Sequence, residues 1–140
     1  MKIKVKIINT KKEYEMCLAI RRQVFILEQN ISKQIETDDY LVNATHILAI
    51  SKEKAVRTTR YRRTDSRIKL ERFAVLKQFR NLDIGKVLVL FILEKLKNEK
   101  FIYLIAQESV IGFYDNLGFD LIGEFFYEAE IPHQKMVYSG

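Results

Sequence analysis

The sequence has little of what several protein classes require. It contains one cysteine, Cys17, so an internal disulfide framework cannot form, and its two histidines are isolated from one another. No apolar run reaches the roughly 20 residues that a membrane-spanning helix needs. The first residues, MKIKVKII, alternate like a strand and lack the long apolar block of a signal peptide. We therefore predict a cytoplasmic protein with no metal site and no membrane association.

Linkers, repeats and low-complexity segments are also missing, which leaves one domain over residues 1–140. Hydrophobic residues make up 48% of the chain and charged residues 30%, as in a globular protein with a single core. The formal net charge of +6 favours anionic ligands.

The most informative stretch runs from Lys69 to Lys97. It reads as a strand over Ile68–Leu76, a polar turn over Arg80–Lys86, and a helix over Val87–Leu96 that is apolar on most of its circumference. A strand, turn and helix in this order direct free backbone N–H groups toward one point, with the positive end of the helix behind them. This arrangement suits a phosphate or pyrophosphate, and Arg80 and Lys86 add positive charge to it.

The remaining segments predict an α+β fold (an α/β sandwich) with a mixed, mostly antiparallel sheet and helices on both faces. Asn9 or Thr10 can cap the first helix, and the strand after the central helix is apolar enough to be buried on both faces. Strands are expected at Lys2–Ile8, Ala44–Ile50, Ala55–Arg63, Phe101–Ala106, Phe119–Tyr127 and Lys135–Tyr138, and helices at Lys11–Leu27 and Ser109–Asn116.

The central stretch resembles motif A of the GNAT superfamily, the acetyl-CoA-dependent N-acetyltransferases. The family pattern, Arg/Gln-x-x-Gly-x-Gly/Ala after an apolar strand, is matched by Arg80 and Gly85, with Asp83 in place of the first glycine. Asp83 is either a helix N-cap turned away from the phosphates or a carboxylate that repels them. The resemblance implies that acetyl-CoA is the cosubstrate, with pantetheine paired to the backbone of Phe73, Ala74 and Val75 and the pyrophosphate held by Arg80, Leu82, Asp83, Ile84, Gly85 and Lys86.

A second motif, Gln107-x-x-Val110-x-x-Phe113-Tyr114-x-x-x-Gly118-Phe119, resembles the family's Asn-x-x-Ala-x-x-Phe-Tyr-x-x-x-Gly-Phe. The resemblance implies that Gln107 and Tyr114 border the cofactor. It also implies that Tyr114 protonates the departing thiolate. The alternative is that Tyr114 is an aromatic side chain packed against the CoA arm.

Further segments resemble the ElaA/YjcF-like branch of this superfamily, and they occur in the same order as in that branch. They are Val24-Phe25-x-x-Glu28-Gln29, Glu36-x-Asp38-Asp39, Ala44-Thr45-His46, Gly123-Glu124-Phe125 and Ile131-Pro132-His133-x-x-Met136. With motif A they cover most of the chain.

The general base is less well defined. Glu71 shares a strand face with Lys69, Phe73 and Val75 by the two-residue period, and it is either a base or the partner of a nearby arginine. His46 titrates in the useful range and is a second candidate, as is His133, although lone histidines are more often structural. Cys17 is expected to be a small core residue.

The acceptor is expected to be an amine on a small molecule or a peptide. Acidic residues bordering the acceptor would suit a cationic amine, although ordinary solvated carboxylates and caps better explain at least three of the five: Glu28, Asp38, Asp39, Glu128 and Glu130. Homodimers occur in the superfamily, but the sequence identifies no interface.

Two rival functions remain. A domain with this fold could have lost efficient transfer, because Asp83 and Gln107 depart from the family pattern, and could act as a CoA-binding or interaction module. Nucleic-acid binding would rest on Arg57, Arg60, Arg62, Arg63 and Arg67 with Tyr61 among them. Strand alternation directs these side chains to opposite faces, which argues against a nucleic-acid surface.

Overall fold

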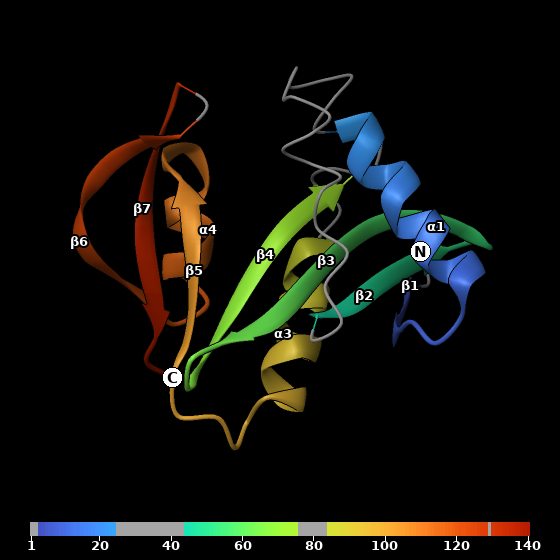
Figure 1. Ribbon diagram of the computed structural model, residues 1–140, viewed down its shortest axis with the longest axis horizontal. Coiled ribbons are helices and arrows are strands. Elements are labelled where there is room, and N and C mark those ends of the chain that lie inside the picture. The colour runs from blue at the N-terminus through green and yellow to red at the C-terminus, as the bar shows by residue number, and fades with distance from the viewer. Residues whose placement is uncertain (1–2, 25–43, 76–83, 129) are drawn as a thin grey trace. The chain divides into compact units, whose positions relative to one another are not determined.

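The computed structural model describes residues 3–24, 44–75, 84–128 and 130–140, whose strands form one mixed sheet (Figure 1). The sheet order is β1-β2-β3-β4-β5-β7-β6; β4 and β5 pair in parallel, whereas β1–β2, β5–β7 and β6–β7 are antiparallel. This confirms the α+β prediction. The elements are β1 Ile3–Ile7, α1 Lys11–Arg21, β2 Ala44–Ser51, β3 Lys54–Thr64, β4 Arg67–Val75, α3 Ile84–Lys95, β5 Ile102–Gln107, the 3₁₀ helix η3 Glu108–Val110, α4 Ile111–Asp115, β6 Phe119–Glu128 and β7 Ile131–Tyr138.

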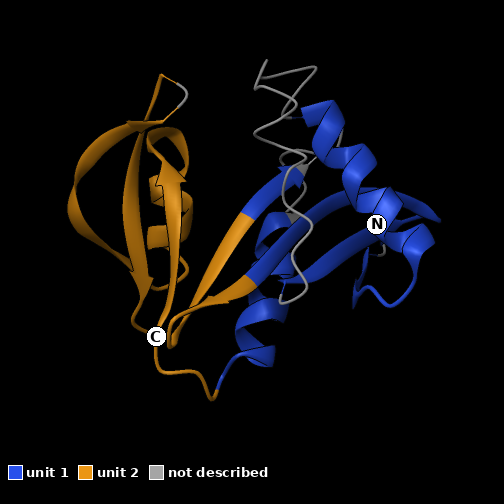
Figure 2. Ribbon diagram, viewed as in Figure 1, with its two compact units in different colours: residues 1–61, 72–97 blue, residues 62–71, 98–140 orange. Residues whose placement is uncertain are grey.

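The contacts divide the chain into two compact units (Figure 2). Unit 1 contains residues 1–61 and 72–97, and unit 2 contains residues 62–71 and 98–140. The boundaries fall within β3 and β4, so each of these strands contributes to both units. The expectation of one domain over residues 1–140 stays a prediction.

The first helix begins as predicted, with Thr10 as its N-cap. The Thr10 hydroxyl oxygen accepts a hydrogen bond from the Glu13 backbone N–H at 3.1 Å, and the Glu13 carboxylate accepts one from the Asn9 backbone N–H at 2.9 Å. The hydrogen bond from Asn9 is the main cause of the lowered pKa of Glu13, and the contact with Lys6 lowers this pKa further. α1 covers Lys11–Arg21, and residues 22–24 continue as a wider helical turn; the predicted end at Leu27 lies outside the described residues.

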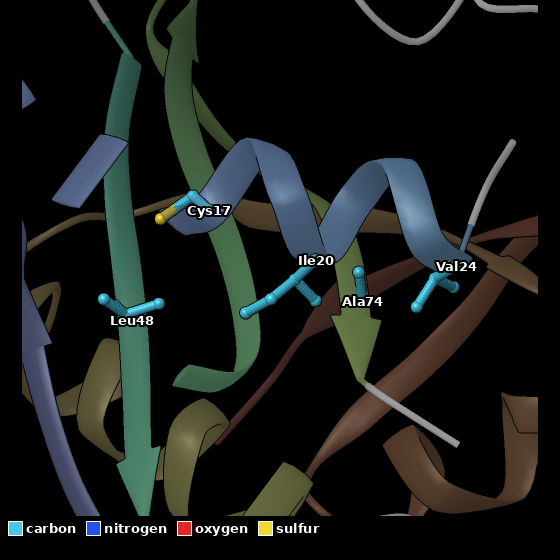
Figure 3. Packing of buried hydrophobic residues seen from close by; sticks show 5 residues of the cluster. All are labelled: Cys17, Ile20, Val24, Leu48 and Ala74. Carbon is cyan, nitrogen blue, oxygen red and sulfur yellow. The ribbon is translucent and has the colours of Figure 1, made fainter. Parts of the chain in front are cut away.

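The core of unit 1 lies between α1 and the sheet (Figure 3). Cys17 and Ile20 of α1 and Val24 of the turn that follows it pack with Leu48 of β2 and Ala74 of β4. The neighbours of Leu48 in β2, Ile47 and Ala49, are fully buried too, so both faces of this strand are covered. Burial raises the pKa of the Cys17 thiol, which is a core side chain as predicted.

This shifted thiol predicts a pH dependence of stability. Because its pKa is higher in the folded state, the folded protein holds the Cys17 proton more tightly than the unfolded chain does. The stabilisation is fully present below the unfolded thiol pKa of about 8.5 and is lost as pH rises through the folded pKa. We expect the free energy of unfolding, measured by urea titration, to fall more steeply above about pH 9 in the wild type than in Cys17→Ala. If the free energy of unfolding falls equally steeply with pH in both proteins, the raised pKa of the Cys17 thiol is contradicted.

The central helix differs from its prediction in two ways. α3 begins at Ile84, inside the expected turn, rather than at Val87. It is buried on one side only, because Val87 is 42% exposed and Leu90 47% exposed, while its buried side chains are Leu88, Val89, Ile92 and Leu93. The long apolar run therefore overstated the burial of this helix, since a run of apolar residues alone does not show which ones the fold covers.

Two strands of unit 2 also differ from their predictions. β5 is buried on one face, by Ile102, Leu104 and Ala106, and only half-buried on the other, so the expectation of burial on both faces was wrong. β7 begins at Ile131 instead of Lys135 and includes Pro132. Proline lacks an N–H donor, but Pro132 pairs only with Tyr127 of β6, one residue before the pairing with β5 begins, so no ladder bond to β5 is lost.

Candidate functional site

The start of α3 carries the charge pattern of an anion site. The first N–H groups of a helix have no partner within the helix, and here the first turn contains Gly85 and the exposed Lys86. A Cβ built on Gly85 would lie 3.2 Å from Cζ and from both terminal nitrogens of Arg57. The guanidinium of Arg57 therefore lies against this glycine, and a Cβ at position 85 would require it to shift by a few tenths of an ångström.

Several predicted cofactor residues lie outside the described residues. Arg80, Leu82 and Asp83 are among them, and for Ile84 the structure describes the backbone, which begins α3. Arg57, half-buried on β3, was not specifically predicted for this position. Its contact with Gly85 joins residues far apart in the chain. The one sequence feature that could have indicated this contact was the glycine, which leaves space for the Arg57 guanidinium.

The motif strand β4 is interrupted just before its predicted pantetheine-pairing residues. Arg72 has φ +58°, a left-handed conformation that is uncommon for a residue with a side chain and that breaks the pleat. The two-residue period that grouped Glu71 with Phe73 and Val75 therefore does not extend past position 72, and that part of the prediction was wrong. Phe73 is half-buried, Ala74 is a core residue, and Val75 ends the strand.

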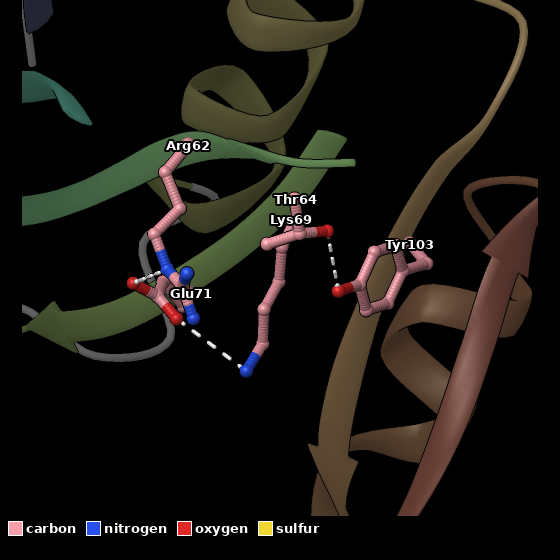
Figure 4. A network of polar contacts seen from close by, with 5 residues as sticks. All are labelled: Arg62, Thr64, Lys69, Glu71 and Tyr103. Carbon is pink, nitrogen blue, oxygen red and sulfur yellow. Dashed lines mark hydrogen bonds and ion pairs between the residues drawn. The ribbon is translucent and has the colours of Figure 1, made fainter. Parts of the chain in front are cut away.

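Glu71 is paired with two cations of unit 2 (Figure 4). Arg62 donates from Nε to Oε2 of Glu71 at 2.9 Å, and Lys69 Nζ lies 3.4 Å from Oε1. The Glu71 side chain is only 6% exposed. The shared face of Lys69 and Glu71 and the pairing with an arginine are both confirmed. A substrate amine at Glu71 would compete with these two cations for the same carboxylate.

Tyr114 is buried in an aromatic cluster of unit 2. Its ring meets Phe113 edge-on at 5.0 Å between centroids and Phe119 at 5.8 Å. The expected helix Ser109–Asn116 is instead η3 followed by α4, with Gln107 at the cap of η3 and no side-chain capping bond there. This packing fits the aromatic interpretation of Tyr114, and the role of its hydroxyl stays a prediction.

Both histidines are held by neighbouring side chains. His46 is 7% exposed and meets the Tyr14 ring edge-on at 5.0 Å. His133 has its Nδ1 2.7 Å from the Ile131 carbonyl oxygen, and its ring stacks on Phe126 at 5.9 Å. These contacts favour structural roles, and the base role of His46 stays a prediction.

The arginines around the β3–β4 hairpin do not form a common stripe. Arg60 is 2% exposed, Arg57 lies against Gly85, and Arg63 pairs with Glu99 at 3.0 Å. A nucleic-acid surface needs its cations exposed together. The buried and paired arginines therefore argue against that function.

The acidic residues proposed to border an acceptor are only partly described. Glu128 and Glu130 are exposed, at the end of β6 and in the turn that follows it, whereas Glu28, Asp38 and Asp39 lie outside the described residues. In the part of the chain that the structure describes, no three histidine, cysteine or acidic side chains gather as metal ligands. None of the helices described there has the length and apolar character needed to cross a membrane.

The comparisons with known proteins agree with the motifs. The sequence model described as "Acetyltransferase (GNAT) domain" matches residues 10–139. The chain is 36% identical over 138 residues to the uncharacterized protein YyaT of Bacillus subtilis, covering 94% of this chain and 93% of that protein. It is 31% identical over 139 residues to the uncharacterized N-acetyltransferase YjcF of the same organism, covering 96% and 99%. The crystal structure of Escherichia coli ElaA superposes with a TM-score of 0.87 at 26% identity, covering 99% of this chain and 100% of that one.

Proposed function

The chain belongs to the GNAT family of acetyltransferases, and from this membership we propose that it transfers an acetyl group from acetyl-CoA directly to a primary amine. The observation that carries the proposal is the family match over residues 10–139, which includes both motifs. The resemblance to the ElaA/YjcF-like branch is confirmed by the same comparisons.

The start of α3 fits the anionic part of acetyl-CoA. Free amides of the first turn, the glycine at position 85 and the cations Lys86 and Arg57 are the donor set that a pyrophosphate requires. We assign Arg80 and the residues Leu82–Lys86 to this group, and the backbone of Phe73–Val75 with Gln107 to the pantetheine arm. A carboxylate at Asp83 is compatible with this assignment as a helix cap.

The chemistry requires one proton to leave the amine and one to reach the sulfur. The neutral amine nitrogen forms a bond to the thioester carbon, the carbon–sulfur bond breaks, and the thiolate takes the Tyr114 hydroxyl proton. The amine proton passes to Glu71, directly or through water, in competition with the contacts of Glu71 to Arg62 and Lys69. His46 is the second candidate for this base. The Tyr114 proton leaves on the sulfur of CoA, so after product release Glu71 gives up its proton to solvent and the Tyr114 phenolate takes one from solvent.

A covalent acyl-cysteine does not fit this chain. The sequence has one cysteine, and Cys17 is fully buried with a pKa raised by burial, so little thiolate forms there. Direct transfer in a ternary complex needs no such nucleophile. The acceptor is an amine on a small molecule or a peptide, and a cytoplasmic location and a homodimer stay predictions.

The proposal is tested by calorimetric titration of acetyl-CoA into the natural protein and the Asp83→Gly variant. We expect the natural protein to bind and to release CoA thiol when amines are added. Binding by the variant alone would mean that Asp83 closes the pyrophosphate site. Binding without turnover on a broad amine panel would favour the CoA-binding module, and the absence of binding in both would overturn the enzyme.

A further inference from the structure

One face of the unit 2 sheet is strongly basic. β3, β4, β5 and β7 together contain a single acidic residue, Glu71. The pairing register aligns Lys69 with Tyr103, and Tyr103 with Val137, so these side chains share a face. Lys135 joins the same face two residues along, opposite Ile105.

Aromatic rings hold the cations of this face in place. The Lys135 ammonium lies 4.7 Å from the centre of the Tyr103 ring and 5.7 Å from that of Phe101, and Arg67 lies 4.6 Å from the Phe101 ring centre. The Tyr103 hydroxyl and the Thr64 hydroxyl are 2.9 Å apart and fix the ring (Figure 4). These cations are therefore preorganised, which reduces the entropy lost when they bind a ligand.

The charge around Glu71 does not balance. Arg62 and Lys69 both contact this carboxylate, and Arg67 of β4 and Lys135 of β7 add two further positive charges to the same face. The register places two more carboxylates on this face, Asp120 and Glu128, but both are exposed on β6, with β7 between them and β5. The excess of positive charge beside Glu71 would repel a second cationic group on the acceptor.

We propose that the acceptor carries, besides its amine, a carboxylate or phosphate that binds at Lys69, on the face that Lys135 also makes positive. This rests on the proposed function, in which Glu71 receives the proton of the acceptor amine. An acceptor whose amine lies at Glu71 can place an anionic group, a few bonds away in the same molecule, at Lys69, whose Nζ is 3.4 Å from that carboxylate. An amino acid or a phosphoamine of this kind meets complementary charge at both ends. A polyamine does not.

Matched amines test the proposal in the thiol-release assay with acetyl-CoA. The pairs are tyrosine with tyramine, lysine with cadaverine, and phosphoethanolamine with ethanolamine. For the best pair, we expect the anionic member to have a kcat/KM about tenfold or more above its partner, as a charge-assisted contact provides. In Lys69→Met/Lys135→Met this difference in kcat/KM within the pair, the gap, should disappear. In Lys135→Met, which leaves the contacts of Glu71 intact, the gap should become smaller. A preference for cadaverine over lysine, or an unchanged gap in both variants, overturns the proposal.

Arg63→Met is the matched control, because Arg63 is 52% exposed and pairs with Glu99 rather than Glu71. It removes one positive charge from the same hairpin and should keep the gap. If no pair is acetylated, the CoA-saturated protein is heated with inorganic phosphate. Phosphate should then raise the Tm of the wild type and of Arg63→Met but not of the double methionine variant, and equal shifts in all three overturn the inference. Titration of acetyl-CoA tests the proposed function separately.

Discussion

Replacing Tyr114 with phenylalanine is expected to lower kcat about 100-fold, while the dissociation constant of acetyl-CoA changes less than about threefold. The variant deletes one hydroxyl and keeps the ring that packs on Phe113 and Phe119. The expected loss is at the lower end of the range for general acid catalysis because a thiolate is a comparatively good leaving group. Stopped thiol-release assays measure kcat, and calorimetry measures the affinity.

Tyr138→Phe is the matched control. The Tyr138 ring also packs on Phe119, at 5.2 Å between centroids, so the same atom is removed beside the same aromatic cluster. Its kcat should be unchanged. If Tyr114→Phe retains full turnover and loses only thermal stability, the hydroxyl is structural and the acid lies elsewhere.

Local pattern explains why the order of elements could be predicted. Alternation and apolar runs report which backbone period a segment adopts, and Thr10 with Glu13 marked the start of α1 correctly. The start of α3 was placed too late because Ile84 and Gly85 look like the end of the turn. The structure includes both in α3, where Gly85 lies against Arg57 of β3, a contact that the local sequence does not show.

The arrangement around Glu71 depends partly on which strands pair in the sheet, and the order of the strands along the chain does not show this. Its contact with Lys69 follows from a period of two within one strand, which a sequence shows. The left-handed residue that ends this period is an arginine rather than a glycine, so nothing marked it. Lys135 reaches Tyr103 because β7 lies between β5 and β6, and the hairpin alone does not say which of its strands joins the sheet.

The second large effect is expected from Arg80→Ala/Lys86→Ala, which should weaken CoA binding about 100-fold. Each charge-assisted contact to a phosphate contributes about 1.5 kcal/mol or more, and two such losses multiply. The Lys86 side chain is exposed on the first turn of α3, so its removal leaves the packing of the helix intact. Calorimetric titration of CoA at fixed salt measures the loss, and unchanged affinity would remove both residues from the pyrophosphate site.

Two comparisons separate a local contact from a general effect of charge. Lys95→Ala/Lys97→Ala removes the same charge from exposed positions at the other end of this helix and its following turn, and should leave CoA affinity within about threefold. Pantetheine lacks the pyrophosphate, so the Arg80/Lys86 variant should bind it as well as the wild type does. If pantetheine binding falls equally, the substitutions act through the fold. If only CoA binding falls, the two cations bind the phosphates, because the pyrophosphate is part of what distinguishes the two ligands.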